Sequence, residues 1–139
     1  MSSIEITDNS AEVLSEKNRL VRAALEAMGN QAVSYAKSNI TEASRVDTGA
    51  LRNSMSHLVA AEEETVYVGT NQEYAIYNEY GTGIYAEGGR GRQTPWRYQD
   101  KKGEWHTTRG IPPIHFLKKA VADHLKEYQM IAESILKGD

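Results

Sequence analysis

The sequence predicts an α+β domain in which a small antiparallel sheet packs against two long helices, with a short middle helix and a protruding β-hairpin arm. Apolar residues recur at helical spacing near both ends of the chain, and they alternate with period two in the middle. Glycine-rich and turn-forming stretches separate these segments. A length of 139 residues favours a single core. We therefore expect one domain over residues 1–139, with residues 1–9 as a flexible N-terminus.

The N-terminal segment carries the pattern of a long helix. Asn9 and Glu12 have the spacing of a capping box, so a helix is expected to begin there. From Val13 to Ile40 apolar residues keep helical spacing, and Gly29 is a candidate kink. A helix of this length offers a packing surface along most of its extent.

The middle of the chain predicts two strands and a short helix. Residues 55–60 and 65–70 flank the acidic turn "AEEE", and the alternation in "TVYVGT" places its two valines on one face. Thr70 and Glu73 form a second capping-box pattern, and Gly81 suits a helix C-terminus. We expect a helix of little more than two turns between them.

Residues 83–110 differ in character from the rest of the chain. A glycine-rich lead-in, interpreted as a flexible hinge, precedes a hairpin with "DKKG" as its turn and aromatic strands on either side. Residues 84–110 contain six Lys and Arg against three Asp and Glu, a charge of +3, so the remainder carries −6. Pro112 and Pro113 then predict the start of a second long helix, which Gly138 ends.

Three interpretations of this arm remain open. Its cations and aromatic rings suit an assembly contact, because Trp, Tyr and Arg are enriched at interface hot spots. A plain surface hairpin whose aromatic side chains pack across the strands is an equal alternative. Base stacking and phosphate contact rank behind both, because few net charges are available. A competing version of the hairpin packs on its own domain, with Trp96 and Trp105 completing the core. The candidate arm residues are Arg90, Arg92, Trp96, Arg97, Tyr98 and Trp105.

Composition excludes several kinds of chemistry. The chain has no cysteine, which removes disulfides, Cys-based zinc sites and thiol nucleophiles and fits assembly in a reducing cytosol. A net charge of −3 does not by itself indicate binding to nucleic acid or to a membrane surface. There is no basic segment followed by an apolar run at the start, and no stretch of about 18 apolar residues. We expect a soluble intracellular chain without a membrane partner.

The segment "VDTGALRNSM" contains the Asp-Thr-Gly triplet of aspartic proteases. Such an enzyme needs two of these loops, which a homodimer using Asp47 would supply. The polar stretch before the triplet and the helical turn after it favour a chain reversal capped by Asp47 or Thr48. The histidines lack metal-ligand spacing, and no Gly-x-Ser-x-Gly or P-loop pattern is present. We expect no enzymatic activity, no cofactor and no metal site, with the dimeric protease as the alternative.

Three motifs in order resemble a family of tailed-bacteriophage neck proteins, over roughly residues 10 to 136. Its type member is product ten of a lambdoid siphophage, and members are called tail-completion, head–tail joining or minor tail components. The motifs are Asp-Thr-Gly-x-Leu-Arg, Tyr-Ala-x-Tyr-x-Glu-x-Gly-Thr and Pro-x-x-Phe-Leu. In this sequence they fall at Asp47, Thr48, Gly49, Leu51 and Arg52; at Tyr74, Ala75, Tyr77, Glu79, Gly81 and Thr82; and at Pro113, Phe116 and Leu117.

The resemblance implies a non-enzymatic virion component, assembled in the host cytoplasm as a ring between the DNA-filled head and the tail. The implied partners are further copies of the chain, in a hexameric ring by family analogy, and the neighbouring tail-terminator and head-closure proteins. DNA would at most pass through the ring. Within the motifs, Arg52 and Glu79 are charged residues in otherwise apolar or tight-turn settings, so we expect a partly buried ion pair between them.

Overall fold

The computed structural model describes residues 10–43, 49–100 and 102–138. The helices and strands lie in this order: α1 (Ser10–Glu42), α2 (Gly49–Ser54), β1 (Ser56–Ala60), β2 (Thr65–Gly69), α3 (Ala75–Tyr80), β3 (Trp96–Gln99), β4 (Trp105–Thr108), α4 (Phe116–Ala122) and α5 (Leu125–Leu136). The expected α+β class is confirmed. None of the described helices is long and apolar enough to cross a membrane.

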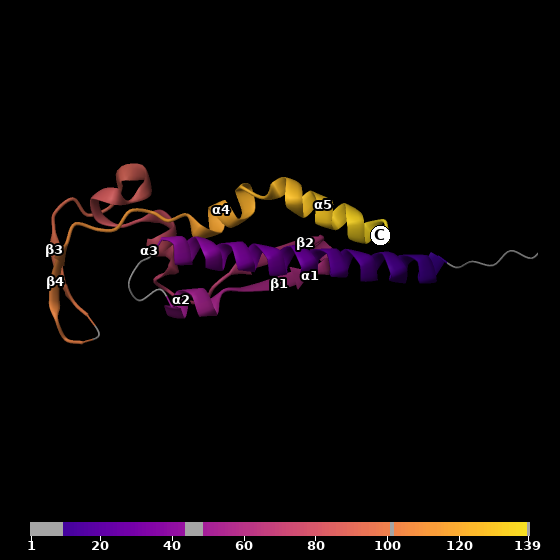
Figure 1. Ribbon diagram of the computed structural model, residues 1–139, viewed down its shortest axis with the longest axis horizontal. Coiled ribbons are helices and arrows are strands. Elements are labelled where there is room, and N and C mark those ends of the chain that lie inside the picture. The colour runs from indigo at the N-terminus through magenta and orange to yellow at the C-terminus, as the bar shows by residue number, and fades with distance from the viewer. Residues whose placement is uncertain (1–9, 44–48, 101, 139) are drawn as a thin grey trace, which may run out of the picture.

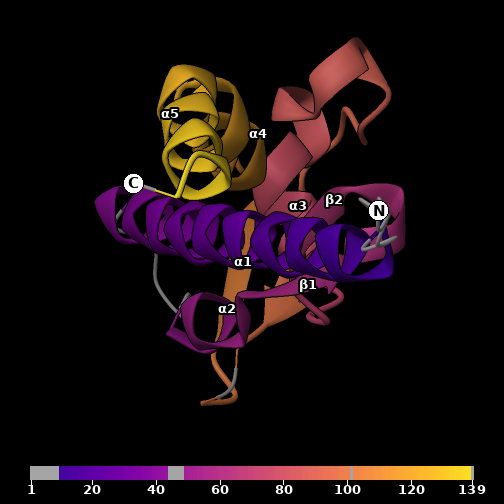
Figure 2. The ribbon, with the colours of Figure 1, turned by 90° about the vertical axis from the view of Figure 1, so that its right-hand side faces the viewer.

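Helix α1 is the axis around which the other elements are arranged. Helices α4 and α5 lie along one side of it, and the β1–β2 hairpin and α2 lie on other sides (Figures 1 and 2). The strands form two separate two-stranded antiparallel sheets, β1–β2 against α1 and β3–β4 in the arm. The arm stands at one end of α1 (Figure 1). The molecule is therefore elongated, with a distinct structure at that end.

The β1–β2 hairpin packs directly on Gly29 of α1. His57 and Val66, on the inner face of the hairpin, lie so close that a β-carbon at Gly29 would be 2.6 Å from the imidazole and 2.9 Å from the valine. The His57 ring also hydrogen-bonds Glu26 of α1 at 2.7 Å. Gly29 therefore lies inside an uninterrupted helix, and the close approach of the sheet, rather than a kink, accounts for the glycine.

The C-terminal helical segment corrects the sequence prediction of one helix opened by Pro112 and Pro113. It begins only at Phe116 and is divided between α4 and α5, because the backbone at His124 leaves helical values (φ −128°, ψ 19°). The His124 ring stacks on Tyr35 of α1, with centroids 3.5 Å apart and planes 2° from parallel. The hydroxyl of Tyr35 donates to Glu127 of α5. Specific polar contacts with α1 thus accompany the break in the helix.

The main core lies toward the arm end of α1. Several of its residues are alanines, which allow the helices to approach one another closely. Its fully buried large side chains come from α1, α2 and α4, so these three elements are fixed to each other. The buried cluster consists of Ala36, Ile40, Leu51, Met55, Ala75, Ile114, Phe116 and Ala120.

The short middle helix differs from the prediction at its start and agrees with it at its end. Helix α3 begins at Ala75, and the predicted cap, Thr70, does not cap it. The Thr70 hydroxyl instead accepts the Gln72 backbone N–H at 3.1 Å in the turn before the helix. At the other end Gly81 has φ +79° and donates its N–H to the Tyr77 carbonyl at 2.8 Å. The predicted role of Gly81 is confirmed.

Replacing Gly29 by alanine tests the packing of the sheet on α1. In an open helix this change stabilises by about 1 kcal/mol, because alanine is the better helix former. Here the new β-carbon meets His57 and Val66, and we expect a loss of about 1–3 kcal/mol from overpacking. Urea unfolding measures whether the substitution raises or lowers the free energy of unfolding. Gly69→Ala is the control, because a β-carbon there meets nothing within 4 Å; stabilisation by Gly29→Ala would contradict the described contact.

Candidate assembly interface

The second and third sequence motifs meet at the N-terminus of α4. The Glu79 side chain is 5% exposed, and its carboxylate accepts the backbone N–H groups of Leu117 at 3.1 Å and Lys118 at 2.9 Å. These N–H groups belong to the first turn of a helix and have no partner within it. A carboxylate at this position satisfies them and interacts favourably with the positive end of the helix dipole. Glu79 therefore acts as a cap supplied from a different helix.

Backbone hydrogen bonds extend the same junction. The Ile114 N–H donates to the Asn78 carbonyl at 2.7 Å, and the His115 N–H donates to the Glu79 carbonyl at 3.2 Å. His115 has a left-handed backbone (φ +55°), which turns the chain into α4. The turn places Phe116 in the core with no exposed surface. The two motifs thus form one structural unit, although more than thirty residues separate them.

The first motif is only partly described, since Asp47 and Thr48 lie outside the described residues. Gly49 begins α2 and is exposed, whereas Leu51 is fully buried in the core. The exposed Arg52 donates to the Thr41 hydroxyl of α1 at 3.2 Å. The expected ion pair between Arg52 and Glu79 is wrong: the Glu79 carboxylate binds the N-terminus of α4, and the Arg52 side chain, in α2, binds Thr41 of α1.

The remaining motif residues divide between the core and the surface. Tyr74 packs against the core, Ala75 is buried, and Tyr77 is 55% exposed. Thr82 exchanges two hydrogen bonds with Ile111, because its N–H donates to the Ile111 carbonyl at 2.9 Å and its hydroxyl accepts the Ile111 N–H at 3.0 Å.

These bonds bring two chain segments together where the arm leaves the body. A β-carbon at Gly81 would lie 2.9 Å from both the Ile111 carbonyl and the Pro113 ring. Gly81 therefore serves both as the end of α3 and as a packing position against the third motif.

The base of the arm is held by close backbone contact. A β-carbon at Gly83 would lie 1.8 Å from the Arg109 carbonyl oxygen, and one at Gly110 would lie 2.0 Å from the Thr82 carbonyl oxygen. The Ile84 N–H also donates to Arg109 at 3.0 Å. At Gly83 and Gly110 glycine is thus required by close approach of the backbone. The two ends of the arm leave the body side by side.

The predicted hairpin is confirmed, and its register separates two faces. Opposite pairs include Trp96 with Thr108 and Gln99 with Trp105, so Trp96 and Tyr98 share one face while Arg97 and Trp105 share the other. The Arg97 guanidinium lies 5.2 Å from the centre of the Trp105 ring. On the first face, Arg92 lies 5.7 Å from the Trp96 ring. Each face therefore combines a cation with a tryptophan.

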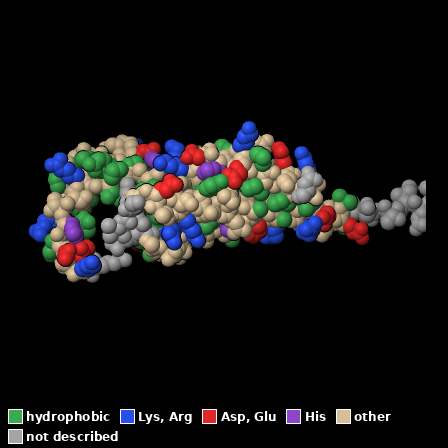
Figure 3. All heavy atoms as spheres, in the orientation of Figure 1, with side chains coloured by type: hydrophobic (Ala, Val, Ile, Leu, Met, Phe, Trp, Pro, Cys, Tyr) green, Lys and Arg blue, Asp and Glu red, His purple; other side chains and the backbone are tan. Residues whose placement is uncertain are grey.

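The arm stands away from the body, with Lys and Arg side chains spaced along it (Figure 3). Trp105 is 59% exposed and Tyr98 is 46% exposed. Among the described residues, none between 84 and 110 belongs to the buried core cluster. The alternative in which Trp96 and Trp105 complete the core is therefore wrong. The aromatic rings of the arm remain available to another molecule.

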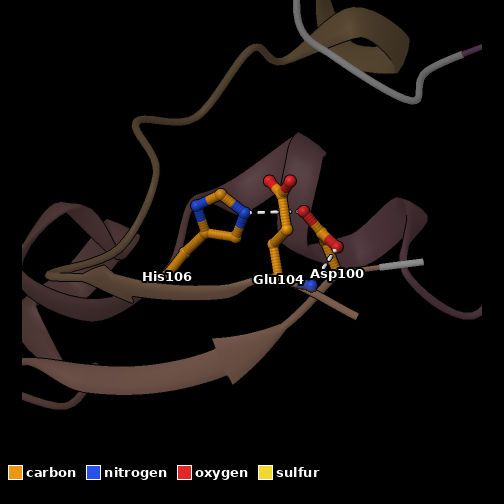
Figure 4. Close-up of side chains that lie close together, drawn as sticks. All are labelled: Asp100, Glu104 and His106. Carbon is orange, nitrogen blue, oxygen red and sulfur yellow. Dashed lines mark hydrogen bonds and ion pairs between the residues drawn. The ribbon is translucent and has the colours of Figure 1, made fainter. Parts of the chain in front are cut away.

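Asp100 organises the turn at the arm tip (Figure 4). Its carboxylate accepts the backbone N–H groups of Lys102 and Glu104 at 2.9 Å and contacts the His106 ring at 2.7 Å. The His106 hydrogen bond is the largest cause that lowers the pKa of Asp100, followed by the backbone bond from Glu104. The spacing between histidines in the sequence did not reveal this contact. The register of the β3–β4 hairpin brings His106 beside Asp100.

The same three side chains offer ligand atoms for a cation. One ligand atom each from Asp100, Glu104 and His106 lies within 4.8 Å of the others, and carboxylate and imidazole groups are common zinc ligands. However, hydrogen bonds within the turn already occupy the Asp100 carboxylate. The arrangement is fully explained as a turn that closes the hairpin.

Comparison with known protein families identifies a relationship over the first part of the chain. A family model described as "Bacteriophage HK97-gp10, putative tail-component" matches residues 5–81, which is more than half of the chain. The match contains the first motif and the second as far as Gly81, and it ends just before the arm. No curated protein and no solved structure matches.

Variants of Glu79 and Arg52 distinguish the helix cap from an ion pair. Glu79→Ala leaves first-turn N–H groups of α4 without their acceptor, so we expect a loss of about 2 kcal/mol. Glu79→Gln keeps one acceptor oxygen and should lose about half as much. Arg52→Met should change stability by less than ~0.5 kcal/mol, because Arg52 is exposed. Thermal melts measure the stability of all three variants. Equal losses of stability in Arg52→Met and Glu79→Ala would support the ion pair instead of the helix cap.

The arm tip should respond to acid through Asp100. Because folding lowers its pKa, Asp100 contributes stability that is present above its unfolded pKa and is lost as pH falls through its folded pKa. His106→Ala should raise the Asp100 pKa toward its ordinary value. Carboxyl NMR titration measures this, with Thr107→Ala on the neighbouring strand position as the control. An unchanged Asp100 midpoint in His106→Ala would show that the backbone bonds alone hold the carboxylate.

Proposed function

Because the chain belongs to the HK97-gp10-like family of bacteriophage tail components, we propose that it is a structural virion protein that joins the head to the tail. In this role it completes the tail as one subunit of a connector ring at the neck. The proposal rests on family membership and on a surface suited to assembly.

The observation that carries the proposal is the number of large apolar side chains on the surface. The β1–β2 hairpin, α3, the arm, α4 and α5 each expose some of them, although isolated monomers normally keep extended apolar patches small. They suit contact with other subunits. Those that are more than 40% exposed on β1–β2, α3, the arm and its root, α4 and α5 are Leu58, Tyr67, Ile76, Tyr77, Tyr80, Ile84, Tyr85, Tyr98, Trp105, Val121, Leu125, Met130 and Leu136.

The shape of the chain supports a ring of identical copies. An elongated body with an arm at one end presents different surfaces at its two ends, and contacts between unlike surfaces close into a ring when the rotation per subunit allows it. We propose a hexamer, by analogy with the family, placed between the tail-terminator and head-closure proteins. DNA passes through the opening without being read.

Two alternative functions can be tested directly, an aspartic protease and a nucleic-acid-binding protein. A dimeric aspartic protease would depend on Asp47, so Asp47→Asn would abolish its peptidase activity; we propose that there is no such activity. Nucleic-acid binding by the arm is favoured by the pairing of Arg97 with Trp105. It would weaken steeply as salt rises, because phosphate contacts release counterions. A binding titration at two salt concentrations therefore tests it.

Disruption of the gene tests the joining function. We expect DNA-filled heads and complete tails to accumulate unjoined, and purified protein to restore infectious particles when it is added to the extract. Electron microscopy and plaque counts measure both effects. If particles of normal infectivity form without the protein, the proposed function is wrong.

Removal of the arm hairpin separates folding from assembly. Replacing residues 95–108 with a short Gly-Ser linker should change the free energy of unfolding little, because no described residue of this segment belongs to the core cluster. The same variant should fail to join heads and tails. Loss of the cooperative unfolding transition in the shortened variant would place the hairpin within the folding unit.

In the intact free protein we expect trypsin to cut at Arg90 and Arg92, and we expect these sites to be protected in the virion.

A further inference from the structure

Charge is divided unequally along this chain. Residues 53–83 contain five glutamates and neither Lys nor Arg, which gives −5, whereas residues 84–110 carry +3. The acidic segment forms β1, β2 and α3, and the basic segment forms the arm. Three of the glutamates, Glu62, Glu63 and Glu64, occupy the β1–β2 turn, where they are exposed. This turn points toward the N-terminal half of α1, and the arm stands at the opposite end (Figure 1).

The outer face of the β1–β2 hairpin has an apolar centre. Leu58 and Tyr67 are opposite each other in the register and point away from α1, at 69% and 54% exposure. A shallow groove of about 310 Å³ lies beside them, between Ser56 on β1 and Asn71 after β2. The Tyr67 hydroxyl donates to Glu63 at 2.7 Å, which ties this apolar centre to the acidic turn. Apolar surface with an acidic border suits a partner that offers an aromatic ring beside a cation.

The arm offers that combination on one face. The Trp105 ring is 59% exposed with the Arg97 guanidinium 5.2 Å from its centre, and Thr107 lies on the same face. Within one copy this face is separate from the core, and none of the described residues packs against it closely enough to bury Trp105. Aromatic side chains with neighbouring arginine are the groups that most often dominate interface energies.

We propose that the arm of one copy docks on the β1–β2 hairpin of the next copy, an inference that rests on the proposed ring. Trp105 enters the groove beside Leu58 and Tyr67, and the arginines of the arm face the glutamates of the β1–β2 turn. The occupant is a second copy because the chain itself carries both complementary surfaces, of opposite charge, at different places on an elongated body. Such a contact joins unlike surfaces, as ring closure requires.

The other apolar surfaces match the arm less well. The exposed side of α5, with Leu125 and Leu136, carries Lys126 and Lys137 together with the exposed Asp123 and Glu133, so its charge is mixed rather than acidic. Helix α3 ends at Tyr80 and leads through Gly81 directly into the root of the arm of the same copy. The β1–β2 hairpin carries three consecutive exposed glutamates at its turn, whereas the groove beside α3 has one exposed glutamate, Glu73, in its lining.

The absence of cysteine allows a direct test, because introduced cysteines are the only thiols in this chain. Thr107→Cys marks the arm and Ser56→Cys marks the groove, and a short bismaleimide is applied to each full-length variant within assembled particles. We expect no dimer from either variant alone, one heterodimer band when the two variants are assembled together, and a ladder up to the closed ring from the double variant. Ser38→Cys, exposed on α1, replaces Ser56→Cys in the control and should give no band with Thr107→Cys.

Charge reversal adds an independent measurement in solution. Arg97→Glu and Glu62→Lys should each weaken self-association roughly fivefold, as expected for an exposed charge contact, and the double reversal should recover most of it. Trp105→Ala should weaken self-association by more than about tenfold while leaving the thermal melt unchanged. Sedimentation velocity measures all four proteins.

The outcomes separate this contact from the joining function. If the cysteine variants enter infectious particles but Thr107→Cys does not cross-link to Ser56→Cys, the proposed docking is overturned and the joining function stands. A cross-link within one chain of the double variant, seen as a shifted monomer without a ladder, also overturns the docking. Normal particles without the protein would overturn the joining function itself. Heterodimers from the mixed variants, with recovery in the charge double reversal, support the docking.

Discussion

The contact on which the rest of the structure depends is the carboxylate of Glu79 at the N-terminus of α4. It fixes the start of a helix that is remote in sequence, and backbone bonds from Ile114 and His115 continue the junction. Through it Phe116 enters the core, α4 and α5 align along α1, and the two ends of the arm are held together. A buried charge without partners costs several kcal/mol. Hydrogen bonds to charged groups contribute about 1.5–3 kcal/mol each, more than the helix dipole at about 0.3–1 kcal/mol, so the two N–H groups are the main compensation.

Local patterns in the sequence predicted most of the fold. Helical spacing identified α1, alternation identified β1 and β2, and turn residues placed both hairpins and the C-terminus of α3 at Gly81. These features depend on residues close together in the chain. The break between α4 and α5 was not predicted, because the apolar stripe continues through it and the stacking of His124 on Tyr35 is a long-range contact. The spacing of Thr70 and Glu73 also suggested a helix cap, but the Thr70 hydroxyl accepts the Gln72 N–H in the turn before α3 instead.

Prediction of the candidate site was less complete. The motifs identified Glu79, Phe116 and Leu117 as structurally important, and the structure brings them together. The partner assigned to Glu79 was nevertheless wrong, since opposite charge suggested Arg52 while the N-terminus of a helix supplied the donors. Sequence shows side-chain charge directly, whereas unpaired backbone N–H groups become apparent only when helix ends are known. The arm residues were identified from composition, and their division into two faces required the hairpin register.

The adjacent ends of the arm have a consequence for how such a protein can diversify. Thr82 and Ile111 are hydrogen-bonded to each other, so the chain returns to its point of departure after the hairpin. A segment with this geometry can change in length and sequence at a closure cost that grows only slowly with length, while the helices beneath keep their contacts. Replacing the arm would therefore change the surface that this end of the molecule presents without requiring a new fold.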